Sequence, residues 1–164
     1  MLKPTGLAIF IGLLFLCTFT VHAQSPVFCL KHVEVVSATR ENWAPGIVKN
    51  NEERTGGIIC EISVRIKKNG DITFQDLILE DQVLPVEVTK DGKRNVPGPF
   101  KKGDRLLLIA RSDKKQSPAA PDESVVLQLK AKNTAGALLY TFKNKQYLRP
   151  VDVLTEKSNR KLPQ

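Results

Sequence analysis

The stretch GIICEISVRIKKNGDITFQDLIL, residues 57–79, predicts two β-strands separated by Asn69-Gly70. From Ile58 to Ile66 apolar side chains occupy alternate positions, and most residues between them are polar. Because successive side chains of a strand point to opposite faces, this spacing indicates one buried and one solvated face. Asn-Gly accepts the positive φ angles of a type I′ turn, so it predicts a hairpin. The alternation resumes at Ile72 and shifts phase near Asp76, where a β-bulge or a strand end is expected.

Further strands are expected on both sides of this stretch. The most hydrophobic run, Arg105–Ala110, is typical of a central strand, and Asp91-Gly92 is a second hairpin signal. Pro85 lacks an amide donor, which favours an edge position for its strand. The other expected strands are 27–38, 83–89, 124–132, 137–143 and 147–153. The pattern predicts an all-β protein with an antiparallel, immunoglobulin-like β-sandwich of seven to eight strands and no amphipathic helix.

The N-terminus has the features of an export signal. Lys3 precedes an apolar run from Leu7 to Val21, which is shorter than the about 20 residues that a membrane span needs. We expect cleavage after Ala23 and export to the periplasm or the medium, with no transmembrane span remaining. A retained anchor is the alternative. Lipid anchoring at Cys17 is not favoured, because Leu16 is bulkier than the usual residue before a lipidated cysteine. Residues 24–154 are expected to form one domain and residues 155–164 a flexible charged tail.

Cys29 and Cys60 are the cysteines that remain after this cleavage. Two cysteines in an exported protein predict a disulfide. Both occupy the inward phase of their expected strands, which favours a Cys29–Cys60 bridge. Two buried free thiols are the alternative.

Catalysis and metal binding are poorly supported. Only His32 remains after cleavage, and on a continuous strand it would face away from Cys29, so a Cys–His pair is not expected. Adjacent acidic residues such as Glu52-Glu53 and Glu80-Asp81 fall in turn-like sequence and point apart. The sequence has no CxxC or HExxH motif and no Asp-rich calcium loop, so we predict no metal, no cofactor and no enzymatic activity.

Basic residues are the clearest remaining signal. The chain has a net charge of +8, and its middle third concentrates lysines and arginines in expected turns. A sandwich gathers its turns at its two ends, where such residues raise a positive potential. The candidate binding residues in these turns are Lys93, Arg94, Lys101, Lys102, Arg105, Lys114 and Lys115. A partner protein, an acidic glycan or another envelope component is expected. Nucleic acid is not expected, because no aromatic residues are interleaved for base stacking. Simple solubility is the alternative role for these charges.

Trp43 is the only tryptophan of the chain and lies in an expected loop beside Pro45-Gly46. It is a candidate binding residue, because tryptophan is enriched at binding hot spots. The alternative is a buried plug that closes one end of the sandwich.

The sequence therefore favours an exported, non-catalytic binding module that recognises its ligand through basic loops on a rigid scaffold. The first alternative is an assembly subunit that adds a partner strand to an exposed edge, either the strand of Pro85 or the first strand. The least favoured alternative is a small secreted hydrolase or metal-binding protein.

Overall fold

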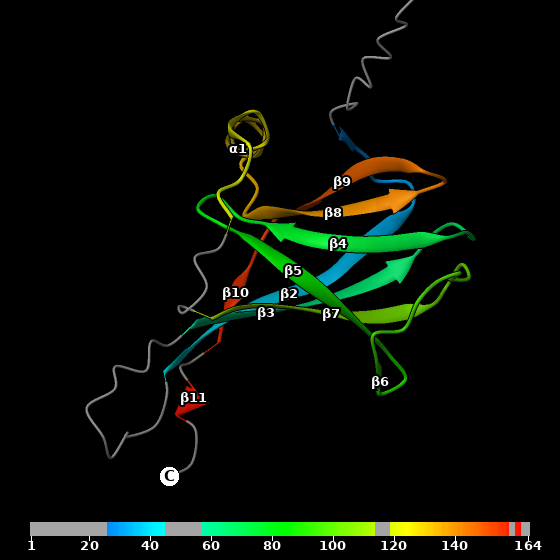
Figure 1. Ribbon diagram of the computed structural model, residues 1–164, viewed down its shortest axis with the longest axis horizontal. Coiled ribbons are helices and arrows are strands. Elements are labelled where there is room, and N and C mark those ends of the chain that lie inside the picture. Colours follow the sequence, from blue (N-terminus) through cyan, green and yellow to red (C-terminus); the bar gives the residue numbers. More distant parts are fainter. Residues whose placement is uncertain (1–25, 45–56, 114–118, 158–159, 162–164) are drawn as a thin grey trace, which may run out of the picture.

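The computed structural model describes residues 26–44, 57–113, 119–157 and 160–161. These residues form eleven strands, joined in one sheet, and one helix (Figure 1). The elements are β1 (Val27–Phe28), β2 (Val33–Ala44), β3 (Gly57–Ile66), β4 (Ile72–Ile78), β5 (Val83–Lys90), β6 (Lys93–Arg94), β7 (Arg105–Asp113), α1 (Glu123–Ala131), β8 (Gly136–Phe142), β9 (Lys145–Val151), β10 (Thr155–Glu156) and β11 (Arg160–Lys161).

The sheet curls into two layers. Its strand order is β1-β9-β8-β4-β5-β7-β3-β2-β10, with β6 paired to β5 and β11 to β2. Strand β5 belongs to both layers, because Val83–Pro85 pair with β4 and Val86–Thr89 pair with β7. The all-β prediction is confirmed. The antiparallel immunoglobulin-like sandwich is not confirmed, because β5 joins the layers and three short pairs, β1–β9, β10–β2 and β11–β2, are parallel.

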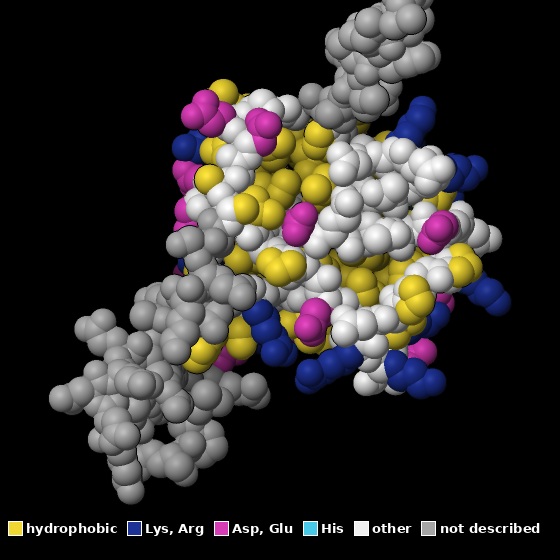
Figure 2. Space-filling model, in the orientation of Figure 1, with side chains coloured by type: hydrophobic (Ala, Val, Ile, Leu, Met, Phe, Trp, Pro, Cys, Tyr) yellow, Lys and Arg dark blue, Asp and Glu magenta, His cyan; other side chains and the backbone are white. Residues whose placement is uncertain are grey.

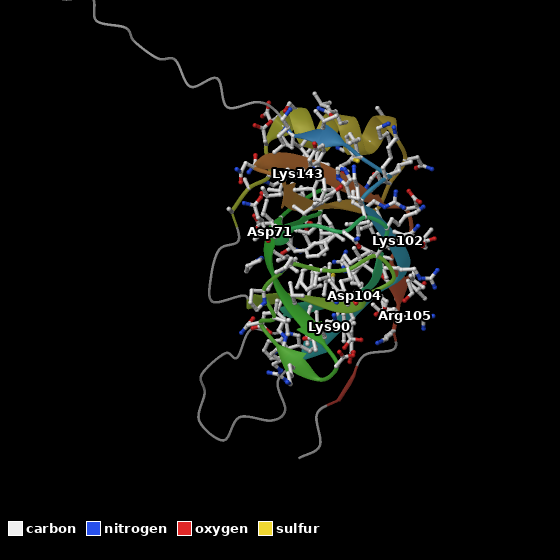
Figure 3. The ribbon with its side chains drawn as sticks, turned by 90° about the vertical axis from the view of Figure 1, so that its right-hand side faces the viewer. Asp71, Lys90, Lys102, Asp104, Arg105 and Lys143 are labelled. Atoms are coloured by element: carbon white, nitrogen blue, oxygen red, sulfur yellow. The ribbon has the colours of Figure 1, made fainter. Side chains whose placement is uncertain are left out.

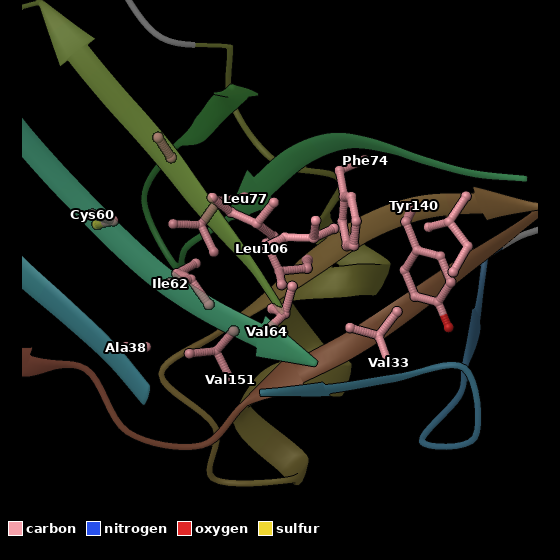
Figure 4. Close-up of a cluster of buried hydrophobic side chains, with 14 of the residues drawn as sticks. Val33, Ala38, Cys60, Ile62, Val64, Phe74, Leu77, Leu106, Tyr140 and Val151 are labelled. Atoms are coloured by element: carbon pink, nitrogen blue, oxygen red, sulfur yellow. The ribbon is translucent and has the colours of Figure 1, made fainter. Parts of the chain in front are cut away.

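The core lies between the two layers, as Figure 4 shows for part of it. The alternation that begins at Ile58 places Cys60, Ile62, Val64 and Ile66 in this core, each at most 1% exposed. The inward side chains of β4 and β8, including Phe74, Leu77 and Tyr140, face them from the other layer. The predicted buried face of residues 57–66 is therefore confirmed.

The predicted hairpin at Asn69-Gly70 is wrong. Strand β3 pairs with β2 and β7, whereas β4 pairs with β8 and β5, so the connection crosses from one layer to the other. Gly70 forms two backbone hydrogen bonds with Phe100 instead, its N–H donating over 3.1 Å and its carbonyl accepting over 3.0 Å. A Cβ at Gly70 would lie 2.5 Å from the Phe142 ring, so the glycine is needed for close packing.

Three other local predictions are confirmed. Asp91 and Gly92 form a two-residue hairpin turn between β5 and β6, with φ angles of 50° and 77°. Strand β7 is central, between β5 and β3. The pairing of β4 with β8 is interrupted between Phe74 and Asp76, which is the predicted bulge.

The expected strand edges need correction. The strand of Pro85 is β5, which lies between β4 and β7 and is not an edge. The expected first strand, residues 27–38, is divided into β1 and β2 by a bend at residues 30–32. Strand β2 then continues to Ala44, so Trp43 lies on a strand and not in a loop.

The expected strand 124–132 is also wrong, because residues 123–131 form α1. Val125 and Leu129, four residues apart, pack on the outer face of β8 and β9 beside Ala137 and Leu148, while Leu127 is 66% exposed. The Asp122 carboxylate accepts a hydrogen bond of 2.8 Å from the Ser124 N–H and caps the helix. The alternating apolar residues favour a strand, whereas the Asp122 cap and the i, i+4 spacing of Val125 and Leu129 favour the helix that forms.

A matched pair of substitutions tests the helix. We expect Leu129→Ala to lower the free energy of unfolding by about 2–5 kcal/mol, because Leu129 is buried, whereas Leu127→Ala should change it by less than about 0.5 kcal/mol. Chemical denaturation followed by circular dichroism measures both values. An inward-facing strand would make the two losses equal, and that outcome would contradict the helix.

The segment that was expected to be a flexible tail contains two short strands. Thr155 and Glu156 pair in parallel with Thr39 and Arg40, and β11 pairs with Trp43 and Ala44. The second half of β2 is therefore covered on the side away from β3.

Candidate functional site

The connections between strands gather basic side chains at one end of the molecule. We call this set the basic end, and all of its members are exposed: Lys31, Lys67, Lys68, Lys93, Arg94, Lys101, Lys102, Arg105, Lys143 and Lys145. They come from the segment before β2, the β3–β4 connection, the β5–β6 hairpin, the approach to β7 and the β8–β9 turn. Figure 3 views this end directly, and Figure 2 shows Lys and Arg along the right-hand and lower margins of the molecule.

The loop that carries Lys101 and Lys102 is held in place by hydrogen bonds. The Lys102 N–H donates to the Asn69 Oδ1 over 2.6 Å, and the Gly103 N–H donates to the Ile66 carbonyl over 2.8 Å. The Asp104 carboxylate accepts from the Lys101 N–H over 2.9 Å. The basic loop is therefore fastened to the end of β3 and to the connection that follows it, so its charges are displayed from an ordered backbone.

Asp104 is the acidic residue most closely engaged with this loop. The Lys90 ammonium lies 2.7 Å from its carboxylate, and hydrogen bonds from Lys90 and from the Lys101 backbone hold the pKa of Asp104 below its usual range. Asp104 thus stays ionised and forms its ion pair with Lys90, not with the exposed cations of the basic end. Among the described residues the other acids of this end are the exposed Asp71 and Asp91, and Glu34, whose carboxylate lies 3.7 Å from the Arg65 guanidinium.

The structure separates the predicted binding residues. It brings Lys93, Arg94, Lys101, Lys102 and Arg105 to the basic end. Trp43 lies near the opposite end, ten residues beyond the start of β2, which is roughly 33 Å at the usual rise of a strand. Lys114 and Lys115 lie outside the described residues. Trp43 and the described basic loops therefore lie at different ends of the protein.

The sequence interpretation missed half of the basic end, including Lys67, Lys68, Lys143 and Lys145. Lys143 and Asn144 form a two-residue turn with φ angles of 50° and 61°, between paired Phe142 and Lys145. Lysines that flank Asn in a short polar break between strands are a usable signal for such a turn. Lys31, Lys143 and Lys145 lie outside the middle third of the chain, and Lys67 continues the polar positions of the alternating stretch that begins at Ile58.

Trp43 covers Gly57 on the neighbouring strand. The two residues are paired partners of β2 and β3, and a Cβ on Gly57 would lie 2.7 Å from the indole Nε1 of Trp43. Trp43 is half-buried in this position. The arrangement favours the plug interpretation, since part of the indole rests against the neighbouring strand.

His32 is buried among aromatic rings. It is 7% exposed, and its ring centroid lies 4.2 Å from that of Phe142 and 4.9 Å from that of Tyr147. Burial lowers the pKa of His32, and the positive charges of Lys68 and Lys31 lower it further. The imidazole is therefore neutral at pH 7.

The prediction that Cys29 and His32 cannot meet is wrong. The Cys29 Sγ lies 3.6 Å from the His32 Nδ1, because the chain bends between β1 and β2 and does not continue as one strand. The Tyr140 hydroxyl lies 3.2 Å from the same Nδ1. Burial and the neighbouring Cys29 raise the pKa of Tyr140, so its hydroxyl stays protonated.

The predicted Cys29–Cys60 disulfide is not formed, and both cysteines are free. Cys60 lies in the middle of β3, six residues or roughly 20 Å from Ile66, where β2 begins to pair. Cys29 precedes β2 and its N–H donates to the Leu148 carbonyl over 2.9 Å. A disulfide needs Cα atoms within about 7 Å. Burial raises the pKa of the Cys60 thiol to about 11.

Comparisons with known proteins provide no relative for this fold: no family model, curated protein or solved structure matches the chain. Within residues 26–44, 57–113, 119–157 and 160–161, no three His, Cys, Asp or Glu side chains are grouped as metal ligands. The one helix of the described chain is too short to cross a membrane.

Proposed function

We propose that this protein is an exported, non-catalytic binding module whose basic end recognises an acidic glycan. The observation that supports this proposal most directly is the convergence of ten exposed cations from five separate connections. Loops on a rigid β scaffold are a common place for recognition. The N-terminal export signal, expected to end at Ala23, is part of the proposal.

The spread of the charges favours a polymer over a small anion. Lys143 belongs to the β8–β9 layer and Lys102 to the approach of β7 in the other layer, as Figure 3 shows. Packed sheets are about 10 Å apart, so the exposed cations are spread over both layers and are not gathered around one point. An extended chain of carboxylates or sulfates can contact several lysines together, and each such contact releases counter-ions and depends on salt.

Binding to immobilised heparin, with uncharged dextran as the control matrix, tests the proposal. We expect the variant Lys102→Gln/Arg105→Gln/Lys143→Gln to bind heparin about a hundredfold more weakly at low salt, since a lysine or arginine near an anionic surface contributes about 1 kcal/mol. A matched variant changes three cations outside the basic end: Lys130→Gln/Lys132→Gln/Lys157→Gln. This control should retain most of the affinity.

Equal weakening of the two variants would show that net charge alone governs binding, and the proposed site would be wrong. Binding of the unmodified protein to dextran as tightly as to heparin would also contradict the proposal. Denaturation curves of all three proteins exclude loss of folding as the cause.

One observation keeps assembly through a strand edge as the second candidate. Among the described residues, the side of β2 away from β3 is unpaired from Val33 to Ser37. A groove of about 390 Å³ runs beside this edge, and Val36 and Val153 next to it are 56% and 69% exposed. The bulge between Val35 and Ser37 interrupts the edge and disfavours strand addition, so this function ranks second.

A further inference from the structure

We propose that Cys29 is a reactive thiol that exchanges with anionic disulfides, with His32 as the acceptor of its proton. This inference does not depend on glycan binding. It rests on a cluster that joins a partly exposed thiol, an imidazole, a tyrosine hydroxyl and two neighbouring lysines.

The geometry of the cluster supplies the proton acceptor. The Cys29 Sγ and the Tyr140 hydroxyl both lie within hydrogen-bonding distance of the His32 Nδ1, at 3.6 Å and 3.2 Å. The thiol and the hydroxyl can each donate, and Nδ1 is the acceptor in the tautomer that carries the ring proton on Nε2. The backbone also fixes both residues, because the Cys29 N–H donates to Leu148 and the His32 carbonyl accepts from the Lys67 N–H over 2.8 Å.

The charges around the cluster determine which disulfides react. Lys31 and Lys68 are close enough to His32 to lower its pKa, and both belong to the basic end. The same positive charges attract an anionic reagent. Cys29 is partly exposed, whereas Cys60 is 0% exposed, so of the two described cysteines only Cys29 is open to attack a disulfide in the folded protein.

The reaction is balanced without any other oxidant. The Cys29 proton moves to the His32 Nδ1, and the thiolate attacks one sulfur of the anionic disulfide. A new S–S bond forms between Cys29 and that sulfur, the disulfide S–S bond breaks, and the other half departs as a thiolate. The product is a mixed disulfide on Cys29.

The test measures the rate of thiolate release from two reagents. The full chain carries Cys17→Ser so that Cys29 and Cys60 are the thiols present. One reagent is the dianionic 5,5′-dithiobis(2-nitrobenzoate), and the other is the neutral 4,4′-dithiodipyridine. A neutral unstructured cysteine peptide gives the reference rate for each reagent. We expect one thiol to react in the folded protein, with a preference for the dianion about tenfold above that of the peptide. The preference should fall as salt rises.

Four variants test which residues are responsible for the fast reaction and for the preference for the dianion. Cys29→Ser should remove the fast reaction, and Cys60→Ser should leave it unchanged. His32→Gln should slow both reagents about tenfold or more at pH 7, because the proton acceptor is lost. Lys31→Gln/Lys68→Gln should slow the dianion about tenfold and leave the neutral reagent unchanged.

In the three variants that keep it, Cys60 reports whether the protein is folded, since it reacts only after unfolding. If Cys60 reacts in the His32→Gln variant, that variant is unfolded. The Lys31→Gln/Lys68→Gln variant then tests the proposal through the preference for the dianion. The proposal is wrong if Cys29 reacts no faster than the peptide, if a folded His32→Gln variant matches the unmodified rate, or if loss of both lysines leaves the dianion preference intact. Heparin is absent from the assay, so failure here leaves the proposed function standing.

Discussion

The variant Leu77→Ala is expected to lose about 2–5 kcal/mol of unfolding free energy, a large part of the 5–15 kcal/mol that is typical of a whole protein. Leu77 is 0% exposed and pairs with Leu138 on β8 and with Leu84 on β5. Those partners are themselves at most 1% exposed. The substitution therefore leaves a cavity where β4 joins both of its neighbours, and the surrounding side chains relax into it only in part.

The measurement is urea denaturation, supported by the melting temperature. At about 2–4 °C per kcal/mol for a chain of this size, the melting temperature should fall by roughly 5–15 °C. Leu30→Ala is the matched control, because Leu30 is 58% exposed and should shift the transition little. Similar shifts for the two variants would place Leu77 outside the core and contradict the layer arrangement.

The second large effect is expected for Gly57→Ala, because an added methyl group has no room. Its Cβ would overlap the Ser112 carbonyl oxygen on β7 and would lie 2.7 Å from the Trp43 Nε1. A backbone oxygen in a paired strand cannot move aside as a flexible side chain can. Overpacking of this kind costs about 1–3 kcal/mol. Trp43, the only tryptophan, gives a local readout, and its emission should change in the folded variant.

Gly92→Ala separates a steric clash from a backbone effect. A Cβ at Gly92 meets nothing within 4 Å, but its φ of +77° is costly for alanine, about 1–2 kcal/mol. Both variants should lose stability, while only Gly57→Ala should alter the emission of Trp43. An unchanged emission together with unchanged stability in Gly57→Ala would contradict the close approach of β3 and β7.

Only some of the predictions that depend on a few neighbouring residues were correct. The hairpin at Asp91-Gly92 forms because both residues adopt positive φ where two strands already meet. Asn69-Gly70 has the same signal, but the chain uses it differently, since hydrogen bonds to Phe100 replace hairpin pairing. A turn motif indicates where the backbone bends, not which strands pair afterwards.

The helix α1 shows how a single apolar pattern supports two structures. Val125, Leu127 and Leu129 alternate as in a strand, but Val125 and Leu129 also lie one helical turn apart. The outer face of β8 and β9 accepts only that pair, beside Ala137 and Leu148. Tertiary packing therefore selected the helix over the strand.

The basic end was predictable only in part, because its residues come together through tertiary structure. The sequence places basic residues such as Lys101, Lys102 and Arg105 in expected turns, so their exposure was predictable. Their union with Lys67, Lys68 and Lys143 depends on the curl of the sheet, which brings five connections to one end. The Cys29–His32 contact depends on a bend that no local signal indicated.

The sequence by itself determined that the protein is built of strands, which residues of β3 face the core, and that the surface is strongly basic. These properties follow from side-chain alternation and composition, which are local. Only the tertiary structure decided the partners of β4, the helical state of residues 123–131, and the separation of Trp43 from the basic loops. Those outcomes depend on contacts between distant segments, where the burial of apolar surface outweighs local preference.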